Sequence, residues 1–569
     1  MPKILILGIL SFIYFFNQNY FSSHFYQFIF VKKHTIKTTF LNKKKHFFSI
    51  KYVFLILMNM KEKYTVLMIL EGTYPFNGGG VSTWADMLCN KIKNVDYTLY
   101  SINANLELKS KYKLSKNVKD VIQVPLWSPL EPQELINYGS PYFEFAERKE
   151  NDNELQILHV FLPIFERFLT SIYTETRNRD DFDMTFFEMW EFFQKNDYKK
   201  TMKSSIIWRS FCHIVTEVIE NENDEDVSLY DLTVGMRWLY RFLIPLSIDI
   251  PKVDISHLTI SGFPVIPALI LKHKHGTPII ATEHGVFIRE RLLAINSSEY
   301  SFFLKKFLIR LSECVTELVY HKADLILSVN KFNIIWEKLY GANPKNIEVI
   351  YNGIDHELFK PVPKPEHLIG IPTVVAAARI FELKDIITMI KSCAIVKMEI
   401  PNIKYLVYGD NNAVPEYTLE CEALIYELGL KNNFILAGFH DKPNLIFSEG
   451  DISILTSISE GFPYTILESM SCGIPVVATD VGGVSEALDE DCGFICKPKD
   501  YVDIGNKVIE LLKNDTLRKL MGINARNKIL DNFTIEKFIS EYENAYESVL
   551  NPKRETDELY VLETHQEAS

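Results

Sequence analysis

The chain is poor in cysteine and has no CxxC pair. Its eight cysteines are scattered over 569 residues, and the two nearest neighbours are Cys492 and Cys496. This spacing argues against a disulfide framework and against a zinc ribbon, and it is typical of a protein from a reducing compartment. We therefore expect Cys492 and Cys496 to be packing residues.

An excess of positive charge is also absent. The formal net charge of −12 at pH 7 argues against nucleic acid as the main partner. Hydrophobic residues make up 47% of the chain and charged residues 24%, which is ordinary for a globular protein. Because 569 residues exceed what one hydrophobic core usually holds, the length predicts two or three domains.

The first 57 residues contain neither Asp nor Glu, but they carry eight Lys. Their longest apolar run, Ile4 to Phe16, is shorter than the roughly 20 residues that a membrane helix needs. Three interpretations compete: a signal peptide, a membrane-surface anchor, and translated upstream DNA with the true start at Met58 or Met60. We favour the last, and we expect a chain that begins at Met58 to fold and to stay active.

From Tyr64 onward, short apolar runs alternate with amphipathic helices, which is typical of a parallel α/β domain. Val81, Trp84, Leu88 and Ile92 share one face of the first such helix. The strands expected in this half of the chain are Tyr64–Leu70, His257–Ser261, Pro278–Thr282, Asp324–Asn330 and Glu348–Tyr351.

The alternation fails between about residues 128 and 254, where the chain is aromatic and acidic. Phe186, Met189, Trp190 and Phe193 have helical spacing, so we predict a helical insertion in the first domain. We expect the acidic run from Ile219 to Asp226 to be a solvated loop. The Asp-Phe-Asp sequence at residues 181–183 falls in this insertion, so we interpret its two acids as surface residues and not as a metal motif.

A proline-rich linker, Asp355 to Pro372, precedes a second α/β set. We expect an N-terminal domain over residues 58–360, a C-terminal domain over 361–533, a final helix over 534–552 and a tail over 553–569. Two doubly wound Rossmann-like domains facing a cleft form the GT-B arrangement. Ligands of such sheets bind at the carboxyl ends of the strands. The strands expected in the second domain lie at 373–380, 403–410, 433–439, 451–457 and 475–480.

Two carboxylates, Glu460 and Glu468, lie eight residues apart in the apolar stretch SISEGFPYTILESMSCGIPVVATDVGG. Glu460 follows an expected strand, and Pro463 suits the start of the next helix, which places Glu468 in its second turn. Both side chains can face one site beside free backbone N–H groups, where they could accept hydrogen bonds from sugar or ribose hydroxyls. A purely structural alternative is that Glu468 caps a neighbouring loop.

The stretch resembles the donor-site signature of family-4 glycosyltransferases, a Glu-x7-Glu element followed by Gly-x-Pro-Val-Val-Ala-Thr. The resemblance implies that Glu468 holds the ribose of a nucleotide-sugar donor and that Glu460 contacts the donor sugar. It also implies that the amides around Phe462 and Tyr464, together with Thr465, approach the diphosphate.

Two cations, Arg379 and Lys384, follow the first expected strand of the second domain and can neutralise a diphosphate leaving group. Their spacing resembles the Arg/Lys pair of the same family. Taken alone, an Arg and a Lys near a helix start are more often surface charges.

The first domain adds a glycine loop with Gly79 and Gly80, and a histidine, His284, after an expected strand. Glycines before a helix let backbone approach a phosphate or an acceptor closely. His284 aligns with a histidine that the wider family presents to the donor sugar. Together these stretches look like the PelF group, the cytoplasmic glycosyltransferases of Pel exopolysaccharide assembly. Tyr351 departs from the group, which usually has Pro there.

The resemblance implies a retaining glycosyltransferase that moves a hexosyl or N-acetylhexosaminyl group from a UDP-sugar to a growing exopolysaccharide. It implies no metal requirement, no nucleic-acid partner, inner-membrane partners for polysaccharide synthesis and export, and a cytoplasmic location, free or peripheral at the inner membrane. Two alternatives stay open: a GT-B sugar-nucleotide epimerase, and a non-catalytic nucleotide-sugar-binding subunit of a secretion complex.

Overall fold

The computed structural model describes residues 63–105, 108–128, 131, 142–174, 177–222, 227–440 and 442–552. The N-terminal 57 residues, the tail from residue 553 and positions 223–226 lie outside the described residues. The first four positions of the expected acidic loop, 219–222, are helical and end α10 (Ser205–Glu222). The described part of the chain belongs to one compact unit that begins at Lys63.

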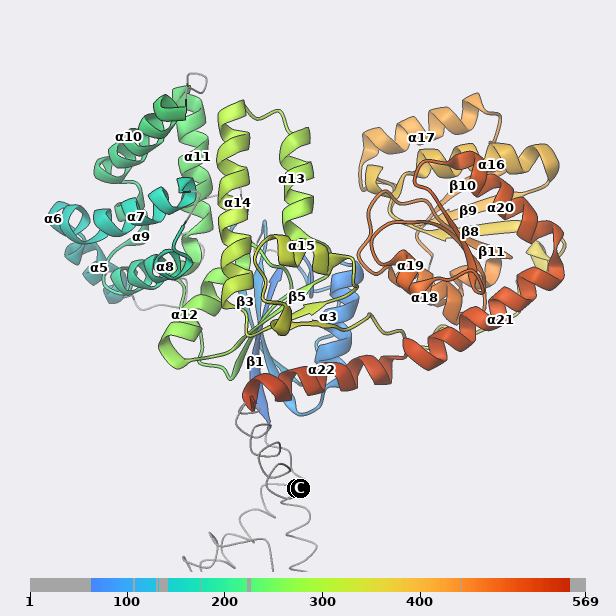
Figure 1. The fold of residues 1–569 in the computed structure, drawn as a ribbon, viewed down its shortest axis with the longest axis horizontal. Helices are drawn as coiled ribbons and strands as arrows, with labels where there is room; N and C mark the ends of the chain where they lie inside the picture. Colours follow the sequence, from blue (N-terminus) through green and yellow to red (C-terminus); the bar gives the residue numbers. More distant parts are fainter. Residues whose placement is uncertain are drawn as a thin grey trace, which may run out of the picture. The chain divides into compact units, whose positions relative to one another are not determined.

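The first sheet has seven parallel strands in the order β3-β2-β1-β4-β5-β6-β7 (Figure 1). Central β1 is apolar and almost wholly buried because strands pair with it on both sides. The strands are β1 (Tyr64–Glu71), β2 (Val95–Ile102), β3 (Val118–Val124), β4 (Ile255–Leu258), β5 (Ile279–Glu283), β6 (Leu325–Ser328) and β7 (Ile347–Val349).

Helices lie in most of the connections between these parallel strands, as is usual for a parallel sheet. The helix after β1 starts at a glycine whose φ of 142° suits no other residue, Gly79. The connecting helices are α3 (Gly80–Lys91), η3 (Phe263–Val265), α12 (Ile266–His275), α13 (Phe287–Ser297), α14 (Phe302–Lys322), α15 (Asn333–Leu339) and η4 (Pro344–Asn346).

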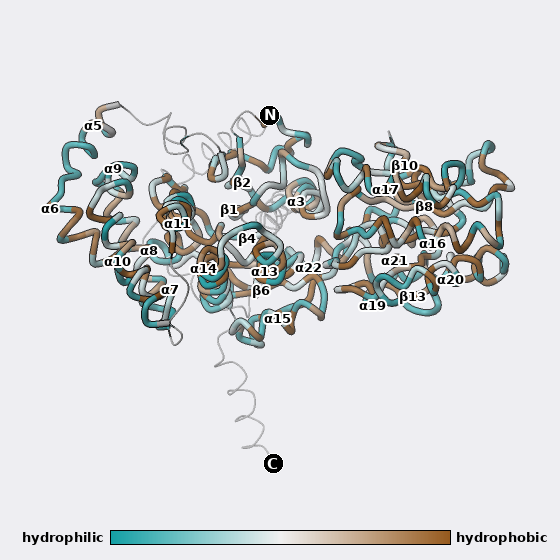
Figure 2. Tube along the Cα trace, turned by 90° about the horizontal axis from the view of Figure 1, so that it is seen from above, coloured by the Kyte–Doolittle hydropathy of each residue, from teal (hydrophilic) through white to brown (hydrophobic). Residues whose placement is uncertain are grey.

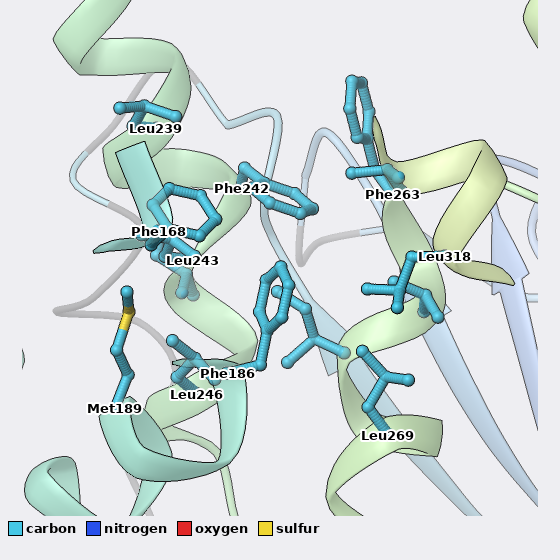
Figure 3. Packing of buried hydrophobic residues seen from close by; sticks show 14 of the residues in the cluster. Phe168, Phe186, Met189, Leu239, Phe242, Leu243, Leu246, Phe263, Leu269 and Leu318 are labelled. Carbon is cyan, nitrogen blue, oxygen red and sulfur yellow. The ribbon is translucent and has the colours of Figure 1, made fainter. Parts of the chain in front are cut away.

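The predicted helical insertion is present between β3 and β4. It consists of α5 (Tyr142–Asn151), α6 (Glu154–Gln156), η1 (Ile157–Phe161), α7 (Leu162–Tyr173), α8 (Arg179–Phe193), α9 (Tyr198–Met202), α10 (Ser205–Glu222), α11 (Leu229–Phe242) and η2 (Ile244–Ser247). Its core is continuous with that of the first sheet: Figure 3 shows Phe186 and Phe242 packed toward Phe263, Leu269 and Leu318. The insertion is therefore part of the first domain and not a separate one.

One described helix, Glu154–Tyr173, has the length and mean hydropathy of a membrane span. Its apolar residues Ile157, Phe161, Phe165 and Phe168 are buried in the core of the insertion. Hydrophobic and hydrophilic positions alternate along the helices of this region (Figure 2), as expected for helices that bury one face.

The structure corrects one prediction in this insertion. Asp183 is not a surface residue: its side chain is 3% exposed and lies 2.9 Å from Nε2 of His273 and 2.7 Å from Nζ of Lys322. A buried carboxylate needs such partners, since an unpaired charge in the core would cost several kcal/mol. Asp181, by contrast, is 48% exposed.

The second sheet has six parallel strands in the order β10-β9-β8-β11-β12-β13. They are β8 (Thr373–Ala377), β9 (Lys404–Tyr408), β10 (Phe434–Gly438), β11 (Ile452–Leu455), β12 (Val476–Thr479) and β13 (Gly493–Cys496). The helices of this half are η5 (Glu366–Leu368), η6 (Glu382–Lys384), α16 (Ile386–Glu399), α17 (Pro415–Glu427), η7 (Pro443–Glu449), α18 (Tyr464–Ser471), α19 (Val484–Ala487), α20 (Tyr501–Lys513) and α21 (Asp515–Asn532). The two parallel sheets confirm the predicted fold class.

The last helix, α22 (Ile535–Leu550), follows the second sheet in sequence but packs against the first. The hydroxyl of Tyr546 lies 2.8 Å from Nδ1 of buried His257 in β4, and the Tyr542 ring meets the edge of Trp84 in α3. Beside this crossing, Ile354 forms a β-bridge with Thr534.

Candidate active site

The predicted carboxylate Glu460 and the predicted cation Lys384 form an ion pair. Nζ of Lys384 lies 2.5 Å from Oε1 of Glu460, and the two side chains are 21% and 11% exposed. Ser457, two residues after the end of β11, also donates to Oε1 of Glu460. Sequence reasoning missed Ser457, although its place at the strand end offered a signal.

Lys384 is held in place by backbone contacts with the β11 loop. Thr456 donates its hydroxyl to the carbonyls of Lys384 and Asp385, and the N–H of Ile458 donates to the carbonyl of Leu383. Asp385 caps α16 from a left-handed conformation with φ 46°. These contacts fix the cation beside the carboxylate before any ligand binds.

Arg379 does not share this ion pair. Its side chain is exposed, and its guanidinium carbon lies 5.0 Å from the ring centre of neighbouring Phe381. No carboxylate of the described residues forms an ion pair with it. Its charge is therefore available to an anionic ligand.

Helix α18 begins at Tyr464, with Pro463 as its N-cap residue, so its first N–H groups face the loop that carries Glu460. The hydroxyl oxygens of Tyr464 and Thr465 are buried and make no hydrogen bond within the described residues. Buried hydroxyls normally have partners, so an unpaired one in this position is suited to a bound polar group.

Glu468 lies one turn further along α18. Burial raises the pKa of its carboxyl to about 7. Within the described part of the chain, its carboxylate makes no hydrogen bond or ion pair, so it does not cap a neighbouring loop there. A carboxyl that is about half ionised at neutral pH can accept hydrogen bonds from hydroxyl groups, and these bonds stabilise its charged form.

His284 follows β5 in the first domain and lies against the second. A Cβ added to Gly461 would be 1.8 Å from the His284 carbonyl oxygen, so the two backbones are in direct contact. Burial lowers the pKa of His284 to about 3, which makes the imidazole neutral at physiological pH. Its Nε2 is buried without a partner, and its ring meets the edge of Trp84 at 4.7 Å.

The glycine loop approaches the same helix start. A Cβ on Gly80 would lie 3.4 Å from the ring of Tyr464, and neither Gly79 nor Gly78 has any atom within 4 Å of such a Cβ. The structure therefore brings together His284, Lys384, Glu460, Tyr464 and the Gly79–Gly80 turn through these contacts.

A second set of contacts joins the two halves next to this site. The carboxylate of Glu486 in α19 accepts the N–H groups of Lys331 and Phe332 and the hydroxyl of Tyr351 at 3.0 Å. Asn352 donates to the carbonyl of Phe462 at 2.8 Å. Tyr351, the departure from the usual Pro, thus supplies a hydrogen bond that Pro could not make.

Replacement of Gly461 by Ala is expected to push the His284 loop away from the loop that carries Glu460 and Gly461, because a methyl group cannot fit 1.8 Å from a carbonyl oxygen. Forced overpacking costs about 1–3 kcal/mol. We expect a lower thermal midpoint. Gly235→Ala is the control, since its added Cβ would make ordinary contacts of 3.4 Å in α11; equal losses in both variants would contradict the prediction.

Two acids beneath the His284 loop are fully buried. Glu283 accepts the N–H of Phe287 and the hydroxyl of Tyr320, and burial raises its pKa to about 8. Burial raises the pKa of Glu337 to about 7, and both of its carboxyl oxygens lack a hydrogen-bond partner.

The contribution of these two acids to folding stability should fall as the pH rises from about 5 to about 8, because they hold protons in the folded state that the unfolded chain releases. We expect Glu337→Gln to flatten this dependence of the thermal midpoint on pH. The exposed Glu357→Gln serves as control. An unchanged slope in Glu337→Gln would show that this carboxyl titrates normally.

No cluster of three or more His, Cys, Asp or Glu side chains that could hold a metal ion is found among the residues that the structure describes. All eight cysteines are free, and Cys492 and Cys496 are buried as predicted.

Comparison with known families divides the chain at the same place as the two sheets. Residues 64–345 match a domain of unknown function, DUF3492, and residues 364–528 match glycosyl transferases group 1. N-acetyl-alpha-D-glucosaminyl L-malate synthase of Bacillus anthracis is 28% identical over 213 residues, which is 36% of this chain and 55% of that protein. The chain thus aligns with little more than half of this relative.

Solved structures share the fold. Sucrose-phosphate synthase from Thermosynechococcus elongatus is similar with a TM-score of 0.54 at 14% identity, covering 86% of this chain and 99% of that one. HepE from Anabaena, in complex with UDP-glucose, has a TM-score of 0.53 at 13% identity, covering 85% and 100%. The chain has the GT-B fold, and the matches together support a glycosyltransferase.

Proposed function

We propose that this chain is a retaining glycosyltransferase that transfers a hexosyl or N-acetylhexosaminyl group from a UDP-sugar to a growing exopolysaccharide. The observation that carries the proposal is the Lys384–Glu460 ion pair, held beside a backbone contact between Gly461 and His284. A fixed cation and a carboxylate thus lie beside the backbone of His284, at the carboxyl ends of strands from both sheets.

In this proposal each residue has one role. Arg379 and Lys384 neutralise the charge that develops on the diphosphate as the glycosidic bond breaks. The N–H groups at the start of α18, with the free hydroxyl of Thr465, hold the diphosphate oxygens, and Glu468 accepts hydrogen bonds from the ribose.

The sugar lies between the two halves. Glu460 orients its hydroxyls, and the neutral imidazole of His284 stabilises positive charge on the sugar ring without adding a charge of its own. The acceptor hydroxyl attacks on the face that the diphosphate leaves, and the departing phosphate oxygen takes its proton. This step needs neither a separate base nor a metal ion.

We further propose that the first domain holds the acceptor and the second the donor. All eight cysteines are free thiols, which fits a cytoplasmic enzyme that is either free or peripheral at the inner membrane. Membrane proteins that synthesise and export the polysaccharide would be its partners, and the PelF group remains the specific subfamily that we propose.

The test is a donor screen with UDP-glucose, UDP-galactose, UDP-GlcNAc and UDP-GalNAc, in which release of UDP is measured with and without EDTA. Transfer with retention would give an α-linked product from an α-linked donor, detected by NMR of the anomeric proton. Conversion of one UDP-sugar into another without acceptor would show an epimerase. Binding of UDP without turnover of any donor would show a non-catalytic subunit.

A further inference from the structure

A second group of aromatic and charged side chains lies at the carboxyl end of the first sheet, outside the Lys384–Glu460 site. Glu71 ends β1, Trp127 follows β3, and Phe263 follows β4 in η3. Arg291 comes from α13, and Trp238 comes from α11 of the helical insertion. We call these five residues the tryptophan cluster.

The contacts within the tryptophan cluster are specific. The indole Nε1 of Trp127 donates to Oε1 of Glu71 at 2.8 Å. The rings of Trp127 and Trp238 meet edge to face with centroids 5.2 Å apart. The guanidinium of Arg291 lies 5.5 Å from the centre of Trp238 and 5.2 Å from that of Phe263. These contacts orient one carboxylate and one guanidinium beside two indole rings.

The cluster is neither a closed core nor an ordinary surface. Phe263 is buried, whereas Glu71, Trp127, Trp238 and Arg291 each keep part of their surface in solvent. Nε of Arg291 is buried and has no hydrogen-bond partner among the described residues. Burial raises the pKa of Glu71 and lowers that of Arg291, so both charges are poorly solvated. Hydrogen bonds from a ligand would stabilise such poorly solvated charged groups.

The position of the cluster connects it to the proposed reaction. Glu71 directly precedes the loop that carries Gly79 and Gly80, and β4, which leads to Phe263, pairs with β5, which leads to His284. Because the strands are parallel, their carboxyl ends share one edge of the sheet. The cluster therefore lies on the acceptor-side domain, along the same edge as His284.

The chemistry of the cluster fits a sugar ring better than an anion or a peptide. The negative faces of indole rings attract the C–H groups of a pyranose, and a carboxylate with a guanidinium can bind adjacent hydroxyls. Glu71 would repel a phosphate. We propose that the tryptophan cluster is a subsite for a neutral sugar unit of the carbohydrate acceptor, which gives the helical insertion a role in substrate binding. This inference rests on the proposed function.

The test measures oligosaccharide binding and donor turnover separately. Calorimetric titration at saturating UDP uses chitotetraose, cellotetraose and maltotetraose as probes. We expect at least one of them to bind the wild-type chain. Glu71→Gln should weaken that binding by about 10-fold or more, as loss of a hydrogen bond to a charged group does. Trp238→Ala, which removes an aromatic face, should weaken it by about 10-fold. Trp238→Phe, which keeps an aromatic ring in the cluster, should bind the oligosaccharide with an affinity between those of the wild-type chain and Trp238→Ala. UDP affinity should change in none of these variants.

The matched control is Trp208→Ala, which removes another half-buried tryptophan of the insertion, one that packs on Phe211 and not in the cluster. Unchanged oligosaccharide affinity in Glu71→Gln and Trp238→Ala, or no binding of any probe to the wild-type chain, would overturn the inference. Neither result would affect UDP release from the donor. If instead the wild-type chain turns over no donor, the proposed function fails, while the titrations still report on the subsite.

Discussion

Arg379→Ala and Lys384→Ala are each expected to lower the rate of sugar transfer by about 10²–10³-fold at saturating donor. Loss of one preorganised charge contact to a leaving group has an effect of this size. Steady-state release of UDP, with the donor identified by the screen, is the measurement. Lys391→Ala is a matched control, because this lysine lies over the ring of Tyr501 and away from the ion pair.

The two variants carry different information. Lys384 neutralises Glu460, so its removal also leaves a partly buried carboxylate without its cation. Among the described residues, Arg379 makes no ion pair and its guanidinium lies over the ring of nearby Phe381, so its removal disturbs the fold less. A large loss of turnover in Arg379→Ala with an unchanged thermal midpoint would therefore indicate a direct contact with the diphosphate. Wild-type turnover in both variants would show that the diphosphate lies elsewhere.

Glu468→Gln and Glu460→Gln are expected to separate nucleotide binding from sugar transfer. If Glu468 holds the ribose, its variant should bind free UDP about 10- to 150-fold more weakly, the equivalent of a hydrogen bond to a charged group. Glu460→Gln should bind UDP normally and transfer sugar poorly. Titration calorimetry with UDP, beside turnover of the active donor, gives both quantities.

The pH adds a second readout for Glu468. Because its pKa is raised to about 7, the ionised carboxylate, which would accept the ribose hydroxyls in the proposed role, forms between about pH 6 and pH 8. The affinity of the wild-type chain for UDP should rise over this pH range, and the rise should be smaller in Glu468→Gln. Ionisation of UDP itself contributes equally to both profiles, so the difference between them reports on Glu468. Parallel pH profiles, with equal UDP affinity in both glutamate variants and the wild-type chain, would remove the ribose role.

The fold could be predicted because most strands are short, continuous apolar runs between helices. Three strands were missed for physical reasons. β2, sequence VDYTLYSI, mixes polar and aromatic residues, and β3, sequence VKDVIQV, is an edge strand with its first half open to solvent. β13 has four residues and begins at Gly493. Such segments are specified by their neighbours more than by their own hydrophobicity.

The candidate site was predicted in part. Glu460, Glu468, Arg379 and Lys384 were singled out by their resemblance to the family-4 signature, because local spacing alone left Arg379 and Lys384 as ordinary surface charges, and their roles stay predictions. The Lys384–Glu460 ion pair and the contact of Gly461 with His284 depend on loops 76 and 177 residues apart in sequence. Asp183 shows the same limit. Its position in the helical insertion could be predicted. Its two partners, His273 and Lys322, could not, because they come from distant helices.

Helix α22 has a consequence for how the protein is made. During synthesis the first sheet leaves the ribosome long before α22, yet the hydroxyl of Tyr546 and the ring of Tyr542 complete the packing around His257 and Trp84. The first domain can therefore reach its final state only after the second sheet and α22 have emerged. A premature stop near residue 533 would spare every strand and still damage the half of the molecule that was translated first. Recombination that exchanges the second sheet and its helices between related genes would have to leave α22 with its original partner.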